Sequence, residues 1–297
     1  MRTLHNFRKR IAGMAFSADG KTLMACARGL WDVAVWNLET SAFEKRDVDG
    51  DGPICCLATS PDGKWVGVGT EAAQVFADRS PDFDYHNRQD FSFGGAPPRP
   101  RVHGIAFGWT KDRSDCRIAF AAGELCTATL KAAEEAEIVG TSSSVVAVAF
   151  SSDGRLLAAV DEGQFALWLR DAWAGEAIDH DGFAQEPRSV CFTADGRTIA
   201  VAVATRVVLC AAEDIRARRA CAHGARVTQV AGHPMRNLVA SAGTDGVVRF
   251  WDTDVGKEAN AYNWNIGRVT AVCFAPDGLT CAADGEKGQI VVWDVDE

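Results

Sequence analysis

The chain has 297 residues, 47% of them hydrophobic, and a formal net charge of −9. This composition is typical of a globular protein with a substantial core, and the negative charge disfavours nucleic-acid binding because phosphate backbones are repelled. The longest apolar run near the N-terminus, at 11–16, is too short for a signal-peptide core, and no run approaches the ~20 residues that span a membrane. We therefore expect a cytoplasmic protein that binds neither nucleic acid nor membrane.

An Asp-Gly pair follows a short apolar run in five places, at 19–20, 62–63, 153–154, 195–196 and 277–278. Asp19 and Asp277 are 258 residues apart, and six intervals over that distance average about 43 residues. Internal repeats of this length are typical of propellers and other repeat arrays. The pattern indicates seven imperfect copies of one unit.

Each copy contains the same succession of predicted strands. A nearly continuous apolar run comes first, for example 145–150, and predicts a strand buried on both faces. The Asp-Gly pair predicts a tight hairpin turn, and a second apolar run follows, for example 155–160. A third run ends in Trp in several copies, and a more polar fourth run leads into the next copy. Four antiparallel strands per copy form the blade of a β-propeller.

Trp251-Asp252 and Trp293-Asp294 match the residue pair that gives the WD-repeat β-propeller family its name. The chain resembles this family over nearly its whole length, although Trp36 and Trp168 keep only the Trp, and Phe76 and Cys210 are weaker equivalents. The resemblance implies an all-β fold, a seven-bladed β-propeller of four-stranded antiparallel blades that is closed by the N-terminal strand. It implies one domain over 1–297, with approximate repeats at 11–40, 53–78, 101–130, 144–170, 187–211, 223–252 and 267–297, and with 1–8 as the outer strand of the last blade.

The sixth copy carries all four residues of the structural tetrad of this family, His223, Ser241, Asp245 and Trp251. The resemblance implies a buried relay in which the carboxylate orients the imidazole and the hydroxyl joins the imidazole to the indole. Ser, His and Asp also form catalytic triads, but in this family the arrangement is structural. The seventh copy has Ala283 in place of the Ser, so we expect that blade to be held mainly by apolar packing.

Four arginines precede the first apolar residue of an inner strand, Arg10, Arg101, Arg226 and Arg268. In a closed ring they would stand around one mouth of the central channel, three of them on consecutive blades. Such a group is a candidate binding site for an acidic peptide or a phosphate group. The alternative is that these are ordinary solvated positions at the start of exposed strands.

Two other features have alternative interpretations. The connection 78–100 is the longest between copies and contains Phe83, Tyr85, Phe91 and Phe93, which either form a functional loop or anchor the outer strand of the second blade. Trp173 and Trp264 lie in outer or connecting regions and could be partly exposed. Most of the ten Cys lie in strand-like runs, so we expect reduced core residues, with the adjacent Cys55 and Cys56 on opposite faces of a strand.

Signals for catalysis are weak. The chain has no Cys-x-x-Cys pair, no P-loop and no Gly-x-Ser-x-Gly motif, and its six His are scattered. We therefore expect no catalytic residue, no metal ligand and no cofactor. The favoured function is a non-catalytic scaffold, monomeric on its own, that binds a protein or peptide on one propeller face. The alternatives are a propeller enzyme or small-ligand binder that uses the channel mouth, and a structural subunit of a larger complex.

Overall fold

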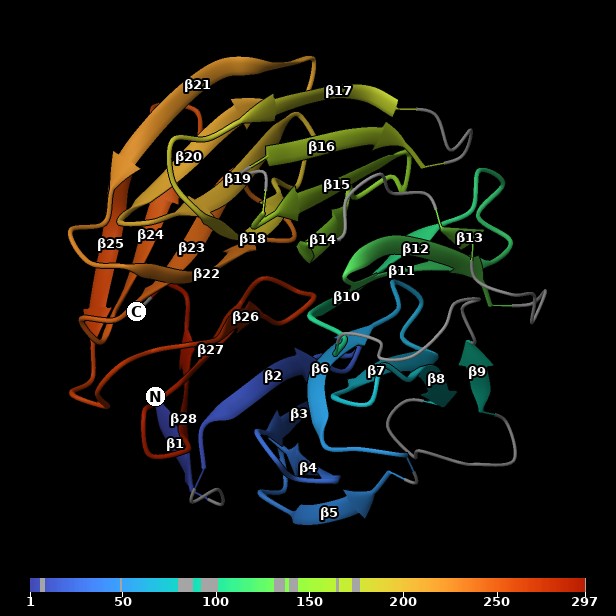
Figure 1. Cartoon of the computed structure of the whole chain (residues 1–297). Helices are drawn as coiled ribbons and strands as arrows, with labels where there is room; N and C mark the ends of the chain where they lie inside the picture. Colours follow the sequence, from blue (N-terminus) through green and yellow to red (C-terminus); the bar gives the residue numbers. More distant parts are fainter. Residues whose placement is uncertain are drawn as a thin grey trace.

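The computed structural model describes residues 1–5, 9–48, 50–79, 88–91, 101–130, 137–138, 144–163, 166–172 and 177–296. These residues form seven four-stranded antiparallel sheets and no helix. The sheets follow one another around a ring in chain order, as blades 1 to 7 (Figure 1). The predicted all-β, seven-bladed propeller is therefore confirmed. Among the residues described there is no long apolar helix of the kind that crosses a membrane.

Each blade contributes one strand to each of four concentric layers. The inner strands are β2 (Ile11–Phe16), β6 (Ile54–Thr59), β10 (Gly104–Trp109), β14 (Val145–Phe150), β18 (Pro187–Phe192), β22 (Val227–Gly232) and β26 (Val272–Phe274). The second strands are β3 (Thr22–Ala27), β7 (Trp65–Thr70), β11 (Cys116–Ala122), β15 (Leu156–Asp161), β19 (Thr198–Val203), β23 (Leu238–Gly243) and β27 (Thr280–Asp284). The third strands are β4 (Asp32–Asn37), β8 (Val75–Arg79), β12 (Glu124–Thr129), β16 (Ala166–Asp171), β20 (Arg206–Ala211), β24 (Val247–Asp252) and β28 (Gln289–Asp294). The outer strands are β5 (Phe43–Asp47), β9 (Gln89–Phe91), β13 (Glu137–Ile138), β17 (Ala177–Gly182), β21 (Asp214–Ala222), β25 (Lys257–Asn263) and β1 (Arg2–His5).

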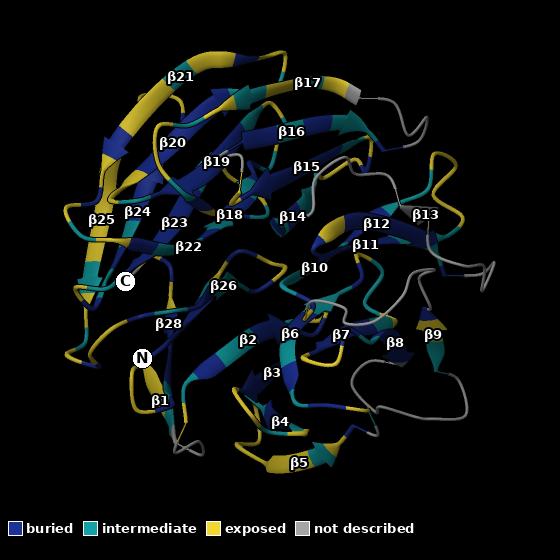
Figure 2. Ribbon diagram, in the orientation of Figure 1, coloured by how far each residue is buried: buried dark blue, intermediate teal, exposed yellow. Residues whose placement is uncertain are grey.

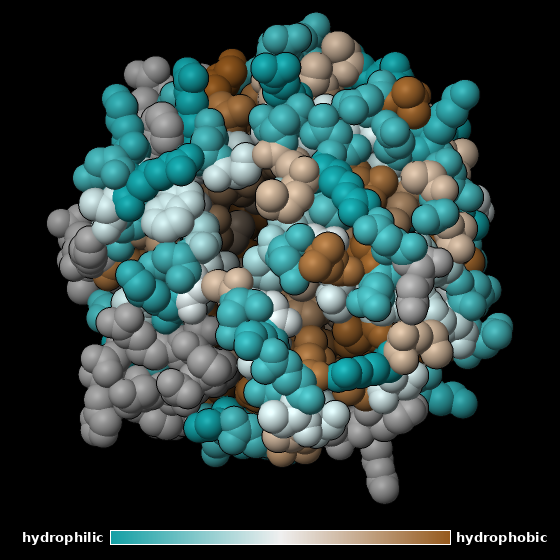
Figure 3. Space-filling model, turned by 180° about the vertical axis from the view of Figure 1, so that it is seen from behind, coloured by the Kyte–Doolittle hydropathy of each residue, from teal (hydrophilic) through white to brown (hydrophobic). Residues whose placement is uncertain are grey.

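The strand directions define two faces of the ring. Because neighbouring strands of a blade are antiparallel, inner and third strands begin on the same face. We call this the upper face; it carries the connections between blades and the turns between second and third strands. The opposite, lower face carries the inner hairpin turns and the turns between third and outer strands. Figure 3 shows one side of the molecule as a mainly hydrophilic surface with patches of hydrophobic atoms and a hollow near its centre.

The lower-face hairpin turns repeat one hydrogen-bonded arrangement. In blade 1, the Ser17 hydroxyl donates to Asp19 Oδ1 at 2.6 Å, and Asp19 Oδ1 accepts from the Lys21 amide at 3.0 Å. The next residue after the Asp adopts a positive φ of 70° at Gly20, where a side chain would be strained. Equivalent hydroxyl–carboxylate bonds occur at Ser60–Asp62, Thr110–Asp112, Ser151–Asp153 and Thr193–Asp195. The predicted Asp-Gly turns are thus confirmed.

The hydrophobic core lies between the blades. The buried apolar residues form seven clusters, and each cluster combines side chains of two neighbouring blades. Figure 2 shows the burial concentrated on the inner three layers, whereas the outer strands β5, β21 and β25 are largely exposed. Each blade is therefore stabilised mainly by its neighbours, as expected of a repeat array.

The N-terminal strand closes the ring. β1 pairs with β28 in antiparallel register, with Arg2 opposite Val292 and His5 opposite Gln289. The Arg2 guanidinium also donates to the Leu38 carbonyl of blade 1. The first and last strands therefore share blade 7, as predicted, and this pairing covers a sheet edge that would otherwise be exposed.

The strand register corrects two of the predicted Trp equivalents. The inner strands carry Phe16, Thr59, Phe107, Phe150, Phe192, Gly232 and Phe274 at equivalent positions in blades 1 to 7. Opposite these residues, through the second strand, the third strands carry Trp36, Asp78, Ala128, Arg170, Cys210, Trp251 and Trp293. Trp168 and Phe76 therefore lie two residues before this position. Residues two apart on a strand share a face, so both side chains keep a similar orientation and the sequence pattern does not reveal the shift. Trp168 instead stacks on His180, with ring centroids 4.8 Å apart.

Candidate functional site

A repeated irregularity at the start of the inner strands shapes the channel mouth. In five blades the register shifts between the first and third residue of this strand, for example between Val227 and Gln229. Such a β-bulge leaves the second residue unpaired and redirects its side chain. In these five blades the second residues, Ala12, Cys55, Val146, Arg188 and Thr228, line cavities at the channel. In blades 3 and 7 the lining includes His103 and Thr270, which lie just before β10 and β26. In five blades the bulge therefore turns a side chain toward the channel.

The channel cavity has a volume of about 470 Å³ and takes lining residues from every blade. Its charged and titratable lining residues are Arg28, Arg101, His103, Glu162 and Arg188. A smaller cavity of about 110 Å³ adjoins it and is lined by Arg28, Arg101 and His103 together with Glu71. Three arginines and one histidine thus meet two glutamates at this mouth.

The four predicted arginines differ in their surroundings. In the described part of the chain, Arg101 is the only one of them that lines the channel cavity. Arg226 is exposed and pairs with Glu186 at 2.6 Å, and Glu186 also pairs with Arg188 at 2.6 Å. Arg268 is exposed on the upper face, and Arg10 is half-buried there.

Two other arginines, missed by the sequence analysis, lie at the mouth instead. Arg28 directly follows the second strand of blade 1, and Arg188 occupies the bulge position of blade 5. For Arg188 the available signal was its place directly after the first residue of the inner strand. It was overlooked because a regular strand would place this residue in the sheet, away from the channel.

The charges at the small cavity are unevenly compensated. Neither Arg28 nor Arg101 has an ion-pair partner among the residues described, although Glu71 lines the same cavity. Burial, and then the positive charge of Arg101, lower the pKa of His103 below its usual value. An anion bound here would raise the pKa of His103 again, because a negative charge favours the protonated imidazole. The arrangement can therefore hold an anionic group.

The tetrad residues of blade 6 lie together, with His223, Ser241 and Trp251 buried and Asp245 exposed at the surface end. His223 Nδ1 is 2.8 Å from Ser241 Oγ, and the Trp251 indole donates to Ser241 Oγ at 2.7 Å. Asp245 Oδ1 lies 3.3 Å from His223 Nε2. Ser241 is completely buried, so its hydroxyl is inaccessible to a substrate. These contacts favour a structural relay over a catalytic triad.

Two neighbours complete the tetrad. Arg249 Nη1 lies 2.9 Å from Asp245 Oδ2 and 2.9 Å from His223 Nε2. Burial, and then the charge of Arg249, lower the pKa of His223, which favours the neutral imidazole. Gly243 leaves the necessary space, because an added Cβ would lie 2.1 Å from His223 Nε2.

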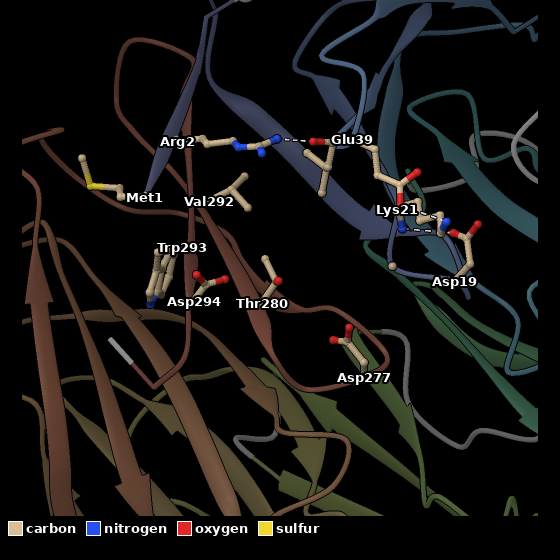
Figure 4. Close-up of a pocket in the computed structure, with 12 residues that line it drawn as sticks. Met1, Arg2, Asp19, Lys21, Glu39, Asp277, Thr280, Val292, Trp293 and Asp294 are labelled. Atoms are coloured by element: carbon tan, nitrogen blue, oxygen red, sulfur yellow. Dashed lines mark hydrogen bonds and ion pairs between the residues drawn. The ribbon is translucent and has the colours of Figure 1, made fainter.

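A further cavity, of about 450 Å³, lies on the lower face where blade 7 meets blade 1 (Figure 4). We call it the seam cavity. Its charged lining residues are Arg2, Asp19, Lys21, Glu39, Asp277 and Asp294. Lys21 pairs with Glu39 at 2.9 Å. The sequence analysis did not identify this site, since it depends on the closure of the ring.

The cysteines are free thiols, and one prediction about them is wrong. Cys55 and Cys56 do not point to opposite faces, because both Sγ atoms approach the Val102 carbonyl oxygen, at 2.7 and 4.0 Å. The cause is the bulge at Cys55, which breaks the alternation of side chains. Burial raises the pKa of Cys210 to about 11 and that of Cys126 to about 12, consistent with inert thiols. In the described part of the chain, no cluster of His, Cys, Asp or Glu could hold a metal ion.

The aromatic candidates divide between the core and the part of the chain that is not described. Phe91 is buried on β9 and thus anchors the outer strand of blade 2. Trp264 packs on Trp293, with ring centroids 4.2 Å apart. Phe83, Tyr85, Phe93 and Trp173 lie outside the described residues. Trp31, which the sequence analysis did not single out, is 49% exposed in the upper-face turn that contains Arg28.

Comparisons with known proteins agree with this architecture. The family model described as WD domain, G-beta repeat matches residues 133–168, 217–252 and 262–294. The serine-threonine kinase receptor-associated protein of Gallus gallus is 22% identical over 161 residues, which are 54% of this chain and 45% of that protein. The small ribosomal subunit protein RACK1 of Neurospora crassa is 31% identical over 65 residues, or 22% of this chain and 21% of that protein. The matched part thus spans less than half of the length of these relatives.

One solved structure extends the likeness to the whole ring. A chain in the crystal structure of the mitotic checkpoint complex superimposes with a TM-score of 0.80 and covers 99% of this chain and 91% of its own length. Its sequence identity is 16%, so the likeness concerns the fold.

Proposed function

The chain belongs to the WD-repeat β-propeller family, and we propose that it is a non-catalytic scaffold that binds an acidic or phosphorylated segment of a partner protein at the upper mouth of its channel. The names of its relatives support a protein partner, because one is described as receptor-associated and another as part of a ribosomal subunit. As part of the same proposal, the protein acts as one cytoplasmic domain, is monomeric when free and binds no nucleic acid.

The single observation that carries the ligand class is the excess of positive charge at the smaller upper cavity, where two arginines and one histidine lie with one glutamate. Arg28 and Arg101 come from blades 1 and 3, and His103 lies beside them. Arginine guanidinium groups form charge-assisted, often bidentate, hydrogen bonds with carboxylates and phosphates. Trp31 adds an exposed aromatic surface in the turn of Arg28, and exposed Trp is favoured at interaction hot spots. In this proposal Arg101 contacts the partner directly, while Arg10, Arg226 and Arg268 add long-range attraction.

The test measures the binding of matched peptides by fluorescence anisotropy. A phosphoserine peptide, its glutamate analogue and its unmodified serine form are titrated with the parent protein and with the R28E/R101E double variant. We expect the two anionic peptides to bind more tightly than the serine form, and the variant to lose about tenfold or more of that affinity. R268E is the control for long-range attraction, because Arg268 is an upper-face arginine that does not line the channel cavity; its reversal should weaken binding much less than R28E/R101E.

Two outcomes would remove the proposed ligand class. One is equal affinity of the parent for the three peptides, and the other is an equal loss of affinity in R268E and in R28E/R101E, which would indicate general charge attraction. The pH dependence gives an independent check. Since a bound anion raises the pKa of His103, the affinity should increase as the pH falls through the titration range of the imidazole.

The second candidate is a small-ligand binder, favoured by the size of the channel cavity. A volume of about 470 Å³ lies in the range of small-molecule pockets. A thermal-shift screen with phosphorylated metabolites and dicarboxylates tests this function, because a specific ligand raises the melting temperature by mass action. A saturable shift in the parent that is absent from R28E/R101E would favour this candidate over a peptide-binding scaffold.

A further inference from the structure

Three exposed apolar side chains belong to neighbouring turns on the lower face of blades 6 and 7. Met235 is 71% exposed, Val255 56% and Leu279 58%. Met235 lies between β22 and β23, Val255 between β24 and β25, and Leu279 between β26 and β27. Single exposed apolar residues are common on protein surfaces, but a group of them on adjoining turns indicates an interaction site.

His233 joins the turn of Met235 to the turn of Leu279. Its Nδ1 accepts a hydrogen bond from the Met235 amide at 3.0 Å. Its Nε2 lies 2.9 Å from the carbonyl oxygen of Gly278, the residue before Leu279. His233 is itself buried, so the two turns are fixed relative to each other.

Asn237 joins the same region to the turn of Val255. Its carbonyl accepts from the Thr253 hydroxyl at 2.9 Å, and its side-chain amide donates to Asp254 at 3.2 Å. The three apolar side chains therefore stand on a connected framework that is in place before a partner arrives. Such preorganisation lowers the entropic cost of binding.

The seam cavity adjoins this apolar group and is negatively charged. Asp277 and Thr280 flank Leu279 along the chain and line the cavity, together with Asp294. Four carboxylates face two basic side chains and the Met1 amino group in the lining, and Lys21 is paired with Glu39. In the described part of the chain, neither Asp277 nor Asp294 has an ion-pair partner. Apolar surface and uncompensated negative charge are thus side by side.

We propose that Met235, Val255, Leu279, Asp277 and Asp294 form a docking surface for a basic amphipathic helix of a partner protein. Apolar residues spaced three and four apart on that helix contact Met235, Val255 and Leu279, while a Lys or Arg enters the seam cavity. The carboxylates repel an anionic membrane. They equally disfavour a second copy of this chain, because each copy would bring the same negative charge to a symmetric contact. The surface is independent of the proposed upper-face site.

The test uses a fluorescein-labelled designed helix of about 18 residues, with leucine on one face and lysine on the other. A second helix carries glutamate in place of each lysine. Anisotropy titrations should show binding of the lysine helix and not of the glutamate helix. We expect L279D and the D277K/D294K double variant each to weaken binding by about tenfold or more.

Matched controls separate this surface from the rest of the molecule. I178D changes an apolar residue that is 51% exposed on β17, far from blades 6 and 7, and should bind like the parent. R101E tests the upper face and should also bind like the parent, so the two sites can fail separately. Thermal melts of every variant check that it folds. L279D removes an apolar contact, whereas D277K/D294K reverses charge, so the proposal can still be tested with one of these variants if the other does not fold.

Several results would overturn the proposal. These are the absence of any binding of the lysine helix, equal binding by the parent, L279D and D277K/D294K, and equal loss in I178D. Binding to phosphatidylserine-containing vesicles that L279D abolishes would assign the surface to a membrane instead. A dimer of the parent in sedimentation that L279D dissociates would assign it to a second copy.

Discussion

A single missing hydroxyl distinguishes the interior of blade 7 from that of blade 6. In blade 6 the Trp251 indole donates to Ser241, whereas in blade 7 the register places Ala283 at the Ser position. The Trp293 Nε1 is buried and has no hydrogen-bond partner in the described residues. We predict that A283S supplies this partner and raises the free energy of unfolding by ~1 kcal/mol, which denaturant melts would measure. A282S, on the opposite side of the strand, is the control and should destabilise; a loss in both variants would refute the prediction.

Asp284 is a second single residue whose effect on stability can be measured. It is buried and accepts hydrogen bonds from the Thr270 and Ala271 amides at 2.6 and 2.7 Å, yet burial outweighs these bonds and raises its pKa to about 6. The native state therefore holds this proton more tightly than the unfolded chain, whose carboxyl titrates near ~4. The contribution of Asp284 to the free energy of unfolding falls as the pH rises from ~4 to ~6 and is constant above that range.

We therefore predict that D284N removes this part of the pH dependence. Between pH ~4 and pH ~7 the stability of the variant should gain ~2–3 kcal/mol relative to the parent. Denaturant melts of both proteins across this range give the difference directly. Parallel curves for the parent and D284N would show that Asp284 does not titrate in the native state.

At the scale of elements, the N-terminal strand β1 can be deleted and then supplied again as a separate peptide. β1 contributes the whole outer edge of blade 7, and Leu4 packs on the cluster between blades 7 and 1. Deletion of residues 1–8 should lower the free energy of unfolding by ~2–4 kcal/mol, because a strand ladder and its apolar contacts are lost. Differential scanning calorimetry would record the lower melting temperature. A synthetic peptide of residues 1–8 should restore it by mass action, and a scrambled peptide should not.

The elements also show how far the sequence could be interpreted. The turns were predictable because Asp-Gly pairs specify them locally, as at Asp19 and Gly20. The third-strand register in blades 2 and 4 was not, since a shift of two residues keeps every side chain on its face. The bulges that turn Cys55 and Arg188 toward the channel leave no mark in the hydrophobic pattern. The channel mouth is lined by Arg28, Arg101, His103 and Arg188, and of these the four-arginine prediction contained Arg101.

At the scale of the whole molecule, the core is distributed rather than central. Each apolar cluster needs two blades, so the loss of one blade would uncover two clusters at once. The blades of the ring therefore depend on one another for their stability. In the proposed scaffold, partners on the upper and lower faces would be held at a fixed separation by this shared core.

The pairing of β1 with β28 has a mechanical consequence. The strands are antiparallel, so the start of β1 and the end of β28 lie side by side at the same end of the strand pair. A pulling force on the two ends would break the backbone hydrogen bonds between them one at a time, as a zipper opens, instead of shearing them together. In optical tweezers the ring should therefore open at low force at this junction, before any other sheet unravels. A protease or translocase that grips either end would meet its weakest resistance there.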